Sequence, residues 1–407
     1  MTTTSDIPDF PFAKPDPLNP PAEWAELRDQ CPVARVRMPS GDEVSLLTRY
    51  SDVREVLADG RFTRDLSVEG AARLADTEDG GTFSRPSAPD VNISHGDGHR
   101  RWRRLLSGSF TMKKMEQWRP KVQAIADQLV DDMIAKGSPG DLMADFGLPL
   151  PVAVICALLG APAKDQDKFA EWSRISLTLT RYTQADVDRA RREFAGYVSA
   201  LVEEKRANPG EDLLSELTQI SDAEDGRLSH AELVATGMGL LLAGHETTSN
   251  MIGKMTGILL AGEREHYRAV VADPGLIPGT VEEVLRTDTN VGIGIPRYIT
   301  EDIEVGGCPV GKGTTLMMLM AAANRDESRF ADPDTFDPRR TNGSQHLTFG
   351  AGPHFCVGQP LARVELQVAL GTLASRLPEL ALRDGADALP MRQGVIAGGF
   401  DNVWVTW

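Results

Sequence analysis

The stretch FGAGPHFCVGQPLAR, residues 349 to 363, restricts the fold most, because it places one cysteine in a glycine-rich loop directly before a helix. Leucines follow at helical spacing, and Pro360 suits the first turn of that helix. Free N–H groups and the positive dipole end at a helix N-terminus stabilise a thiolate, so we expect the pKa of Cys356 to be lowered. From its spacing alone, Cys356 could also be an inert buried thiol or the nucleophile of a cysteine hydrolase.

The residues around this cysteine suggest a large partner. Gly350, Gly352 and Gly358 would let the backbone come close to something flat or bulky. The neighbouring aromatic residues, Phe349 and Phe355, would keep water out.

Composition excludes several other classes. Of the 407 residues, 41% are hydrophobic and 25% are charged, which is typical of a globular protein. The net charge of −16 argues against a nucleic acid as partner. The four cysteines, Cys31, Cys156, Cys308 and Cys356, show neither CxxC nor a paired Cys/His spacing, so we expect no disulfide framework and no structural zinc.

Apolar runs are too short for a membrane span, which needs roughly 20 residues. The first twenty residues are acidic and proline-rich and do not resemble a secretory signal. We therefore expect a cytoplasmic protein without a membrane segment. No repeat or linker divides the chain, so we interpret residues 1–407 as one domain, with residues 1–20 as a surface arm.

Hydrophobic periodicity predicts a mainly α-helical fold. Apolar residues recur three and four positions apart through most of residues 112–205. Strand patterns are confined to residues 43–50 and 299–319, and the prolines of residues 330–340 predict an irregular loop.

A capping box, Ser229 with Glu232, opens a long helix that we expect to reach about Gly262. Its centre is unusual, because Ala243 and Gly244 precede the polar string HETT at 245–248 inside an apolar face. Two explanations remain: close helix packing at the glycine, or room for a ligand beside the hydroxyl of Thr247 and the carboxylate of Glu246.

Glu283 and Arg286 fall one turn apart on a predicted helix. A surface ion pair is the default interpretation. Glu283 could also close a capping box with Thr280.

Several of these segments together resemble the cytochrome P450 family. The loop FGAGPHFCVGQPLAR is similar to the family's haem-binding loop, with Leu361, Ala362 and Arg363 in register as well. AGHETT at 243–248 resembles the oxygen-binding helix segment, Glu283 and Arg286 match the ExxR pair, and HRRWRR from His99 resembles the haem-flanking helix. The resemblance covers nearly the whole chain in the family's order. It implies a large helical bundle with a small β-rich subregion, and a haem between the long central helix and the cysteine loop.

The resemblance also implies a role for each matching residue. Cys356 would be the axial thiolate ligand of haem b, iron protoporphyrin IX. Thr247 and Glu246 would deliver protons during dioxygen activation, Ala243 and Gly244 would leave space there, and Glu283 with Arg286 would be structural. The donors to the haem propionates would be His99, Arg103, Arg297 and His354, and the residues lining the haem would include Phe349, Gly350 and Gly358.

One segment departs from the family. After Arg286 the chain reads TDTNVGIGIPRY, where a proline within a few residues and bulkier side chains are more common. This segment faces substrate in relatives, so the departure puts the direction of Arg297 in doubt.

The resemblance implies a monooxygenase that hydroxylates or epoxidises a hydrophobic small molecule, in bacterial secondary metabolism, with O2 and two electrons. Without a flavin or iron–sulfur motif, the electrons would come from a ferredoxin and its ferredoxin reductase. The basic residues for docking would be Arg100, Arg101, Arg103, Arg104, Lys113 and Lys114; the alternative is a solvated helix face. Rival functions are oxidation without oxygen insertion, such as aryl coupling or skeletal rearrangement, and a non-catalytic haem sensor. We expect a monomer.

Substrate identity does not follow from the sequence. The expected contact regions are residues 84–94, 170–190, 236–247, 290–297 and 394–398.

Overall fold

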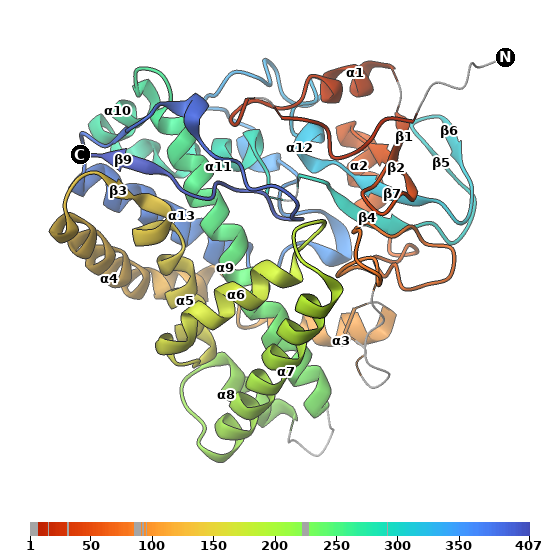
Figure 1. Cartoon of the computed structure of the whole chain (residues 1–407), viewed down its shortest axis with the longest axis horizontal. Helices are drawn as coiled ribbons and strands as arrows, with labels where there is room; N and C mark the ends of the chain where they lie inside the picture. Colours follow the sequence, from red (N-terminus) through yellow and green to blue (C-terminus); the bar gives the residue numbers. More distant parts are fainter. Residues whose placement is uncertain are drawn as a thin grey trace.

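Most helices lie on one side of the molecule and most strands on the other in a computed structural model (Figure 1), which describes residues 7–407 except 15, 31, 85–90, 92, 95, 222–227 and 291. The predicted helical stretch 112–205 is confirmed. The helices are α1 (Glu23–Gln30), α2 (Tyr50–Ala58), α3 (Gly96–Ser107), α4 (Met112–Lys136), α5 (Pro149–Leu159), α6 (Gln166–Ser176), α7 (Gln184–Ala207), α8 (Leu213–Ser221), α9 (His230–Leu260), α10 (Glu265–Ala272), α11 (Ile277–Thr287), α12 (Met320–Ala323) and α13 (Gln359–Arg376).

The strands form small sheets. The largest has the order β1-β2-β7-β4, in which β2 and β7 are parallel and the other pairs antiparallel. A second sheet has the order β3-β9-β8, and β5 pairs with β6. The strands are β1 (Val33–Arg37), β2 (Glu43–Leu47), β3 (Gly140–Asp141), β4 (Ile295–Tyr298), β5 (Ile303–Val305), β6 (Cys308–Val310), β7 (Thr315–Met318), β8 (Ala381–Leu382) and β9 (Trp404–Thr406).

The strand predicted for residues 43–50 ends early. β2 stops at Leu47, and Tyr50 begins α2, so the prediction is wrong for the last residues. The N–H of Tyr50 donates to Oδ2 of Asp326 at 2.8 Å, and this distant carboxylate caps the helix. Such a cap cannot be read from the local pattern. The irregular loop at 330–340 and the strands of 299–319 are as predicted.

The long helix is α9, and the capping box is present. Ser229 Oγ accepts from the N–H of Glu232, while the Glu232 carboxylate accepts from the N–H of Ser229. In Figure 1, α9 runs through the helical side between α5, α7 and α13. The largest apolar cluster surrounds it, with buried side chains from α4, α5, α7, α9, α11 and α13. Burial of each large apolar side chain contributes about 1.5–3 kcal/mol to the stability of the fold. Because the cluster surrounds α9, this helix is the axis of the core.

Described residues before α1 contact the rest of the protein. Phe10 is buried, and its N–H donates to the carbonyl of Arg37 at 2.8 Å. Leu18 packs against the apolar cluster around α9. The expected surface arm is therefore anchored through the part that the structure describes.

The cysteines and the apolar character of the helices were the remaining features predicted from the sequence. Cys156, Cys308 and Cys356 carry free thiols, whereas Cys31 lies outside the described residues. Among the described helices, none combines the length and apolar character that crossing a membrane requires.

Glu283 and Arg286 form a buried pair, so the surface default is wrong. Arg286 donates to both carboxylate oxygens of Glu283, at 2.8 and 2.7 Å, and to the carbonyl of Asn324 at 2.9 Å. Glu283 also accepts from the N–H of Asp337 at 3.0 Å. Thr280 lies inside α11, so it does not cap the helix. The pair joins α11 to the loops on both sides of it.

Replacing Glu283 with glutamine should lower the free energy of unfolding by about 3 kcal/mol, because the variant leaves a buried guanidinium without its counter-charge. Urea unfolding would measure the change, and Glu263→Gln, at an exposed position, should cost less than about 0.5 kcal/mol. Burial by itself would raise the pKa of Glu283, but hydrogen bonds from Arg286 and Asp337 outweigh it and lower the pKa. The stabilisation should therefore be complete above the ordinary carboxyl pKa and decline as pH falls below it. Equal stability of both variants would contradict this role.

Candidate active site

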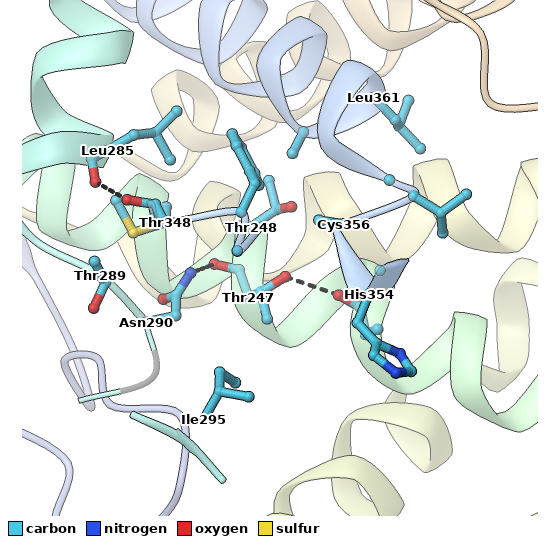
Figure 2. Close-up of a pocket in the computed structure, with 18 of the residues that line it drawn as sticks. Thr247, Thr248, Leu285, Thr289, Asn290, Ile295, Thr348, His354, Cys356 and Leu361 are labelled. Atoms are coloured by element: carbon cyan, nitrogen blue, oxygen red, sulfur yellow. Dashed lines mark hydrogen bonds between the residues drawn. The ribbon is translucent and has the colours of Figure 1, made fainter. Parts of the chain in front are cut away.

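A cavity of about 360 Å³ lies between α9 and the cysteine loop (Figure 2). Most of its wall is apolar, with contributions from α5, α9, α11 and α13. Many of the predicted site residues line it: Ala243, Gly244, Thr247, Arg297, Phe349, Gly350, His354, Cys356 and Gly358. The sequence therefore identified both opposite walls of one cavity.

The cysteine loop is held by contacts at both of its ends. The N–H of Cys356 donates to the carbonyl of Phe349 at 2.9 Å, which closes the loop. The Arg363 guanidinium lies 4.7 Å from the ring centre of Phe349 and donates to both carboxylate oxygens of Glu282, at 2.6 and 2.9 Å. Gly352 has φ +69°, and a Cβ there would lie 2.4 Å from Cα of Ala58, so only glycine fits. The thiol is thus fixed relative to α2, α11 and α13.

The expected lowering of the Cys356 pKa is not found. Burial raises the pKa of this thiol, and this effect exceeds the opposing influence of the Gly358 and Gln359 N–H groups and of Arg103. The helix N-terminus is present as predicted, since α13 begins at Gln359, but desolvation of the anion outweighs it. A thiol of this kind becomes a thiolate when a metal cation takes the place of its proton.

Cationic side chains gather at one side of the cavity. Arg297 is 1% exposed, and Nη1 donates to the carbonyl of Pro296 at 2.8 Å, but its buried Nε has no hydrogen-bond partner. Burial, followed by the nearby charge of Arg64, lowers the pKa of Arg297 to about 10. Arg64 also lines the cavity, although the residue is exposed. Within the described part of the chain, neither guanidinium forms a salt bridge, so the cluster lacks an anion.

Two histidines extend this cluster. The rings of His99 and His354 lie 4.1 Å apart between centres. Burial, then the charge of Arg64, lowers the pKa of His354 to about 3, so its imidazole is neutral near pH 7. His99 and Arg103 are not part of the cavity wall; His99 lies behind His354, and burial lowers the pKa of Arg103.

Thr247 lies on the opposite wall, on α9. Its hydroxyl donates to the carbonyl of Ala243 at 2.8 Å, and its own carbonyl accepts from Nδ2 of Asn290 at 2.7 Å (Figure 2). A threonine that bonds back to the preceding turn competes with the regular hydrogen bonds of the helix there. The hydroxyl oxygen keeps acceptor capacity beside the cavity.

Gly244 is required for helix packing. A Cβ on it would lie 2.7 Å from Cδ1 of Ile155, on α5. Close packing, one of the two explanations left open by the sequence, therefore accounts for the glycine, although Gly244 also forms part of the cavity wall.

Glu246 faces away from the cavity. It is 5% exposed, and Oε1 accepts from Nη1 of Arg392 at 2.6 Å. Arg392 also donates from Nε to Oδ1 of Asp401 at 3.1 Å, and Asp401 is exposed. A charged chain therefore joins the surface to the residue next to Thr247.

The expected substrate regions are only partly on the wall. Residues of 236–247 and 290–297 line the cavity, whereas none of the described residues in 170–190 or 394–398 does. These two latter segments are joined to each other, because the N–H of Leu179 donates to the carbonyl of Gly394 and that of Ile396 to Leu177, both at 2.8 Å. Most of region 84–94 lies outside the described residues.

Sequence reasoning missed several residues of the site. Arg64 and Arg392 had no recognisable motif, and each reaches the site from a segment without a regular pattern. Asn290 falls in the expected contact region 290–297, but its hydrogen bond to Thr247 was not predicted. Glu365 lies on α13 and lines the cavity, and burial raises its pKa well above the ordinary value.

The chain resembles known proteins over nearly its full length. Residues 275–384 match the family model "Cytochrome P450". Mycinamicin IV hydroxylase/epoxidase of Micromonospora griseorubida is 39% identical over 98% of both chains, and nocardicin C N-oxygenase of Nocardia uniformis subsp. tsuyamanensis is 38% identical over 100% of both. Among solved structures, the putative thioether synthase SgvP, involved in the tailoring step of griseoviridin, has a TM-score of 0.92 at 37% identity and covers 99% of this chain and 100% of its own.

These matches define a class of bacterial oxidative enzymes. The chain belongs to the cytochrome P450 family and is a monooxygenase of its bacterial type, as the sequence predicted.

The family implies a haem, and the cavity fits that group. A flat macrocycle needs apolar walls, a metal ligand on one face and cations near its carboxylates. The cavity has an apolar wall with Cys356 on one side, and the buried Nε of Arg297 has no partner. The arrangement of thiol, apolar wall and unpaired guanidinium is thus complementary to a haem.

Gly244→Ala should lower the free energy of unfolding by about 1–3 kcal/mol, because its methyl group would overlap Ile155. Combining it with Ile155→Ala should cost less than the sum of the two single changes. Gly239→Ala is the matched control on α9, since a Cβ there meets nothing within 4 Å. Thermal and urea unfolding would measure all four variants. If Gly244→Ala is as stable as the control, packing does not explain the glycine.

Proposed function

We propose that the protein hydroxylates or epoxidises a hydrophobic small molecule of bacterial secondary metabolism, with O2 and two external electrons. The observation that carries the proposal is one apolar cavity with the Cys356 thiol on one wall and the Thr247 hydroxyl on the other. The names of relatives support the substrate class, since one acts on mycinamicin IV and another on nocardicin C.

In this proposal the cofactor is haem b. Cys356 would supply the thiolate ligand, and Arg64, Arg297 and Arg103, with His99 and His354, would hold the propionates. The bound group supplies the iron at which dioxygen is activated. The apolar wall excludes water, and the neutral imidazole of His354 acts as a hydrogen-bond donor rather than as a charge.

Thr247 and Glu246 deliver the protons. The Thr247 hydroxyl borders the cavity and can pass a proton, while its bond to Ala243 fixes its direction. Glu246 is separated from the cavity wall and paired with Arg392, so the acid acts from behind Thr247. Release of Arg392 toward the exposed Asp401 would free Glu246 for its role.

A second candidate is oxidation without insertion of oxygen. The similarity to a putative thioether synthase, at 37% identity over nearly the full chain, favours it specifically. The mass of the product distinguishes the two reactions, because hydroxylation or epoxidation adds one oxygen atom.

Cys356→Ser tests the thiolate. In the ferrous holoprotein with carbon monoxide, the parent should show the red-shifted Soret band of a thiolate-bound haem, and the variant should lose it, because a serine hydroxyl donates far less electron density to iron. Cys308→Ser, at a β-strand position outside the cavity, is the control and should keep the band. A variant at position 356 with an unchanged spectrum would refute the ligand assignment and the function with it.

Electrons in this proposal come from a ferredoxin and its reductase, the protein is a cytoplasmic monomer, and the docking surface includes α3. Part of the predicted basic group is already engaged: Arg101 pairs with Glu232, and Lys114 lies 3.9 Å from Glu216. Arg104 is exposed, and Arg100 pairs with the exposed Asp97 of its own helix.

Reversing Arg100 and Arg104 to glutamate should slow the first electron transfer from ferredoxin several-fold at low ionic strength, and the difference should shrink at high salt. Stopped-flow reduction of the ferric protein would measure the rate. Arg192→Glu, at an exposed position of α7, provides the matched charge reversal. Equal rates for all variants would place the docking surface elsewhere.

A further inference from the structure

The chain segment that follows α11 is fastened along α9. Lys254 Nζ, on α9, donates to Oδ1 of Asp288 and to the carbonyl of Thr289, both at 2.8 Å. Lys254 and Asp288 are both buried, and Lys14 approaches the other oxygen of Asp288 at 3.5 Å. A buried ammonium with a carboxylate and a carbonyl as acceptors is a rigid attachment, since moving either element leaves an unpaired charge.

The next residue reaches the oxygen-activating turn of α9. Asn290 Nδ2 donates to the main-chain carbonyl of Thr247 at 2.7 Å, and the carbonyl of Asn290 accepts from the N–H of Gly398 at 2.9 Å. Thr247 and Lys254 are seven residues apart on α9 and therefore share one face. The segment 288–290 thus runs beside α9 for two turns, attached at both ends.

The Asn290 contact fixes the amide in one orientation. Only the NH2 group can face a carbonyl, because two oxygens at this distance would repel each other. Oδ1 is consequently turned away, and it has no hydrogen-bond partner. An amide held in this way, with one buried acceptor unsatisfied, costs free energy that its bond to Thr247 must offset.

Two side-chain donors meet main-chain carbonyls on successive turns of α9. The carbonyl of Ala243 accepts from the Thr247 hydroxyl, and the carbonyl of Thr247 accepts from Asn290. Side-chain donors that bond to helix carbonyls distort the regular ladder. The first support belongs to α9 itself, whereas the second is imposed from a different part of the chain.

We propose that Asn290 is a positioning residue for Thr247: its amide holds the Thr247 carbonyl and so sets where the Thr247 hydroxyl stands in the cavity. The inference rests on the proposed role of Thr247 in proton delivery. It assigns a function to the segment that departs from the family pattern, and it makes this segment part of the oxygen-activating machinery as well as part of the cavity wall.

Two variants of nearly the same shape test the hydrogen bond. Asn290→Leu and Asn290→Asp both remove the donor, and the aspartate also faces the carbonyl with an oxygen. Hydrogen exchange of the α9 amides around residues 247–251, measured in the substrate-free holoprotein, should become roughly fivefold faster in the leucine variant, the factor that one ordinary hydrogen bond supplies. It should become faster still in the aspartate variant. Asn342→Asp is the control. It removes a side-chain amide hydrogen bond of the same kind, from Asn342 to the carbonyl of Arg329, outside the cavity.

The second measurement reports on the position of the Thr247 hydroxyl, with carbon monoxide as the probe. The stretching frequency of carbon monoxide in the ferrous holoprotein responds to dipoles near it, so both variants should shift it. In a Thr247→Ala background, the Asn290 changes should add little further shift, because the residue through which they act is gone. A residue that only fills space would be replaced by leucine without either effect.

Unchanged exchange of α9 and an unchanged carbon monoxide frequency in both variants would overturn the proposal. So would equal shifts with and without Thr247. If the aspartate variant does not retain haem, the leucine variant decides the outcome. Neither measurement requires a substrate or turnover, so the inference can fail while the monooxygenase proposal stands. Failure of that proposal would instead be seen in the spectrum of Cys356→Ser.

Discussion

The interaction on which the site depends is the attachment of the cysteine loop to α11. Arg363 donates to both carboxylate oxygens of Glu282 and covers the ring of Phe349. The Thr348 hydroxyl donates to the carbonyl of Leu285 at 2.5 Å. The adjacent Glu283 is paired with Arg286, one turn further along α11. Neighbouring carboxylates of one helix therefore serve two purposes: the first holds the loop, and the second holds α11 in the fold. The thiol position is consequently determined by the core and not by the loop alone.

The cavity separates charge from apolar surface in a way that favours one kind of occupant. Guanidinium groups of Arg64 and Arg297 stand at one side without a carboxylate partner among the described residues, while most of the remaining wall is apolar. Burial lowers the pKa of Arg297, whose side chain is 1% exposed, so the fold holds this charge against its desolvation cost. Proteins rarely keep buried cations unpaired without a function. A flat group with an apolar body and acidic side chains satisfies both requirements.

The sequence predicted what depends on local pattern. The capping box at Ser229, the helix after Cys356 and the pairing of Glu283 with Arg286 each arise from residues a few positions apart, where helix geometry decides the contact. Burial could not be predicted in the same way: it turned the expected surface pair into a buried one and reversed the expected pKa shift of Cys356. The partners of Thr247 and Glu246 also escaped, because Asn290 and Arg392 come from irregular segments that only the tertiary fold brings to α9.

These long-range contacts have a shared arrangement. α9 carries the polar string at 245–248 through an apolar core, and other segments contact the helix there. Ile155 fills the space beside Gly244, Arg392 pairs with Glu246, and Asn290 binds the carbonyl of Thr247. A helix with a glycine and a back-bonded threonine at its centre is locally weak. Because these contacts come from separate segments, the geometry of this turn is set by the tertiary fold and not by α9 alone.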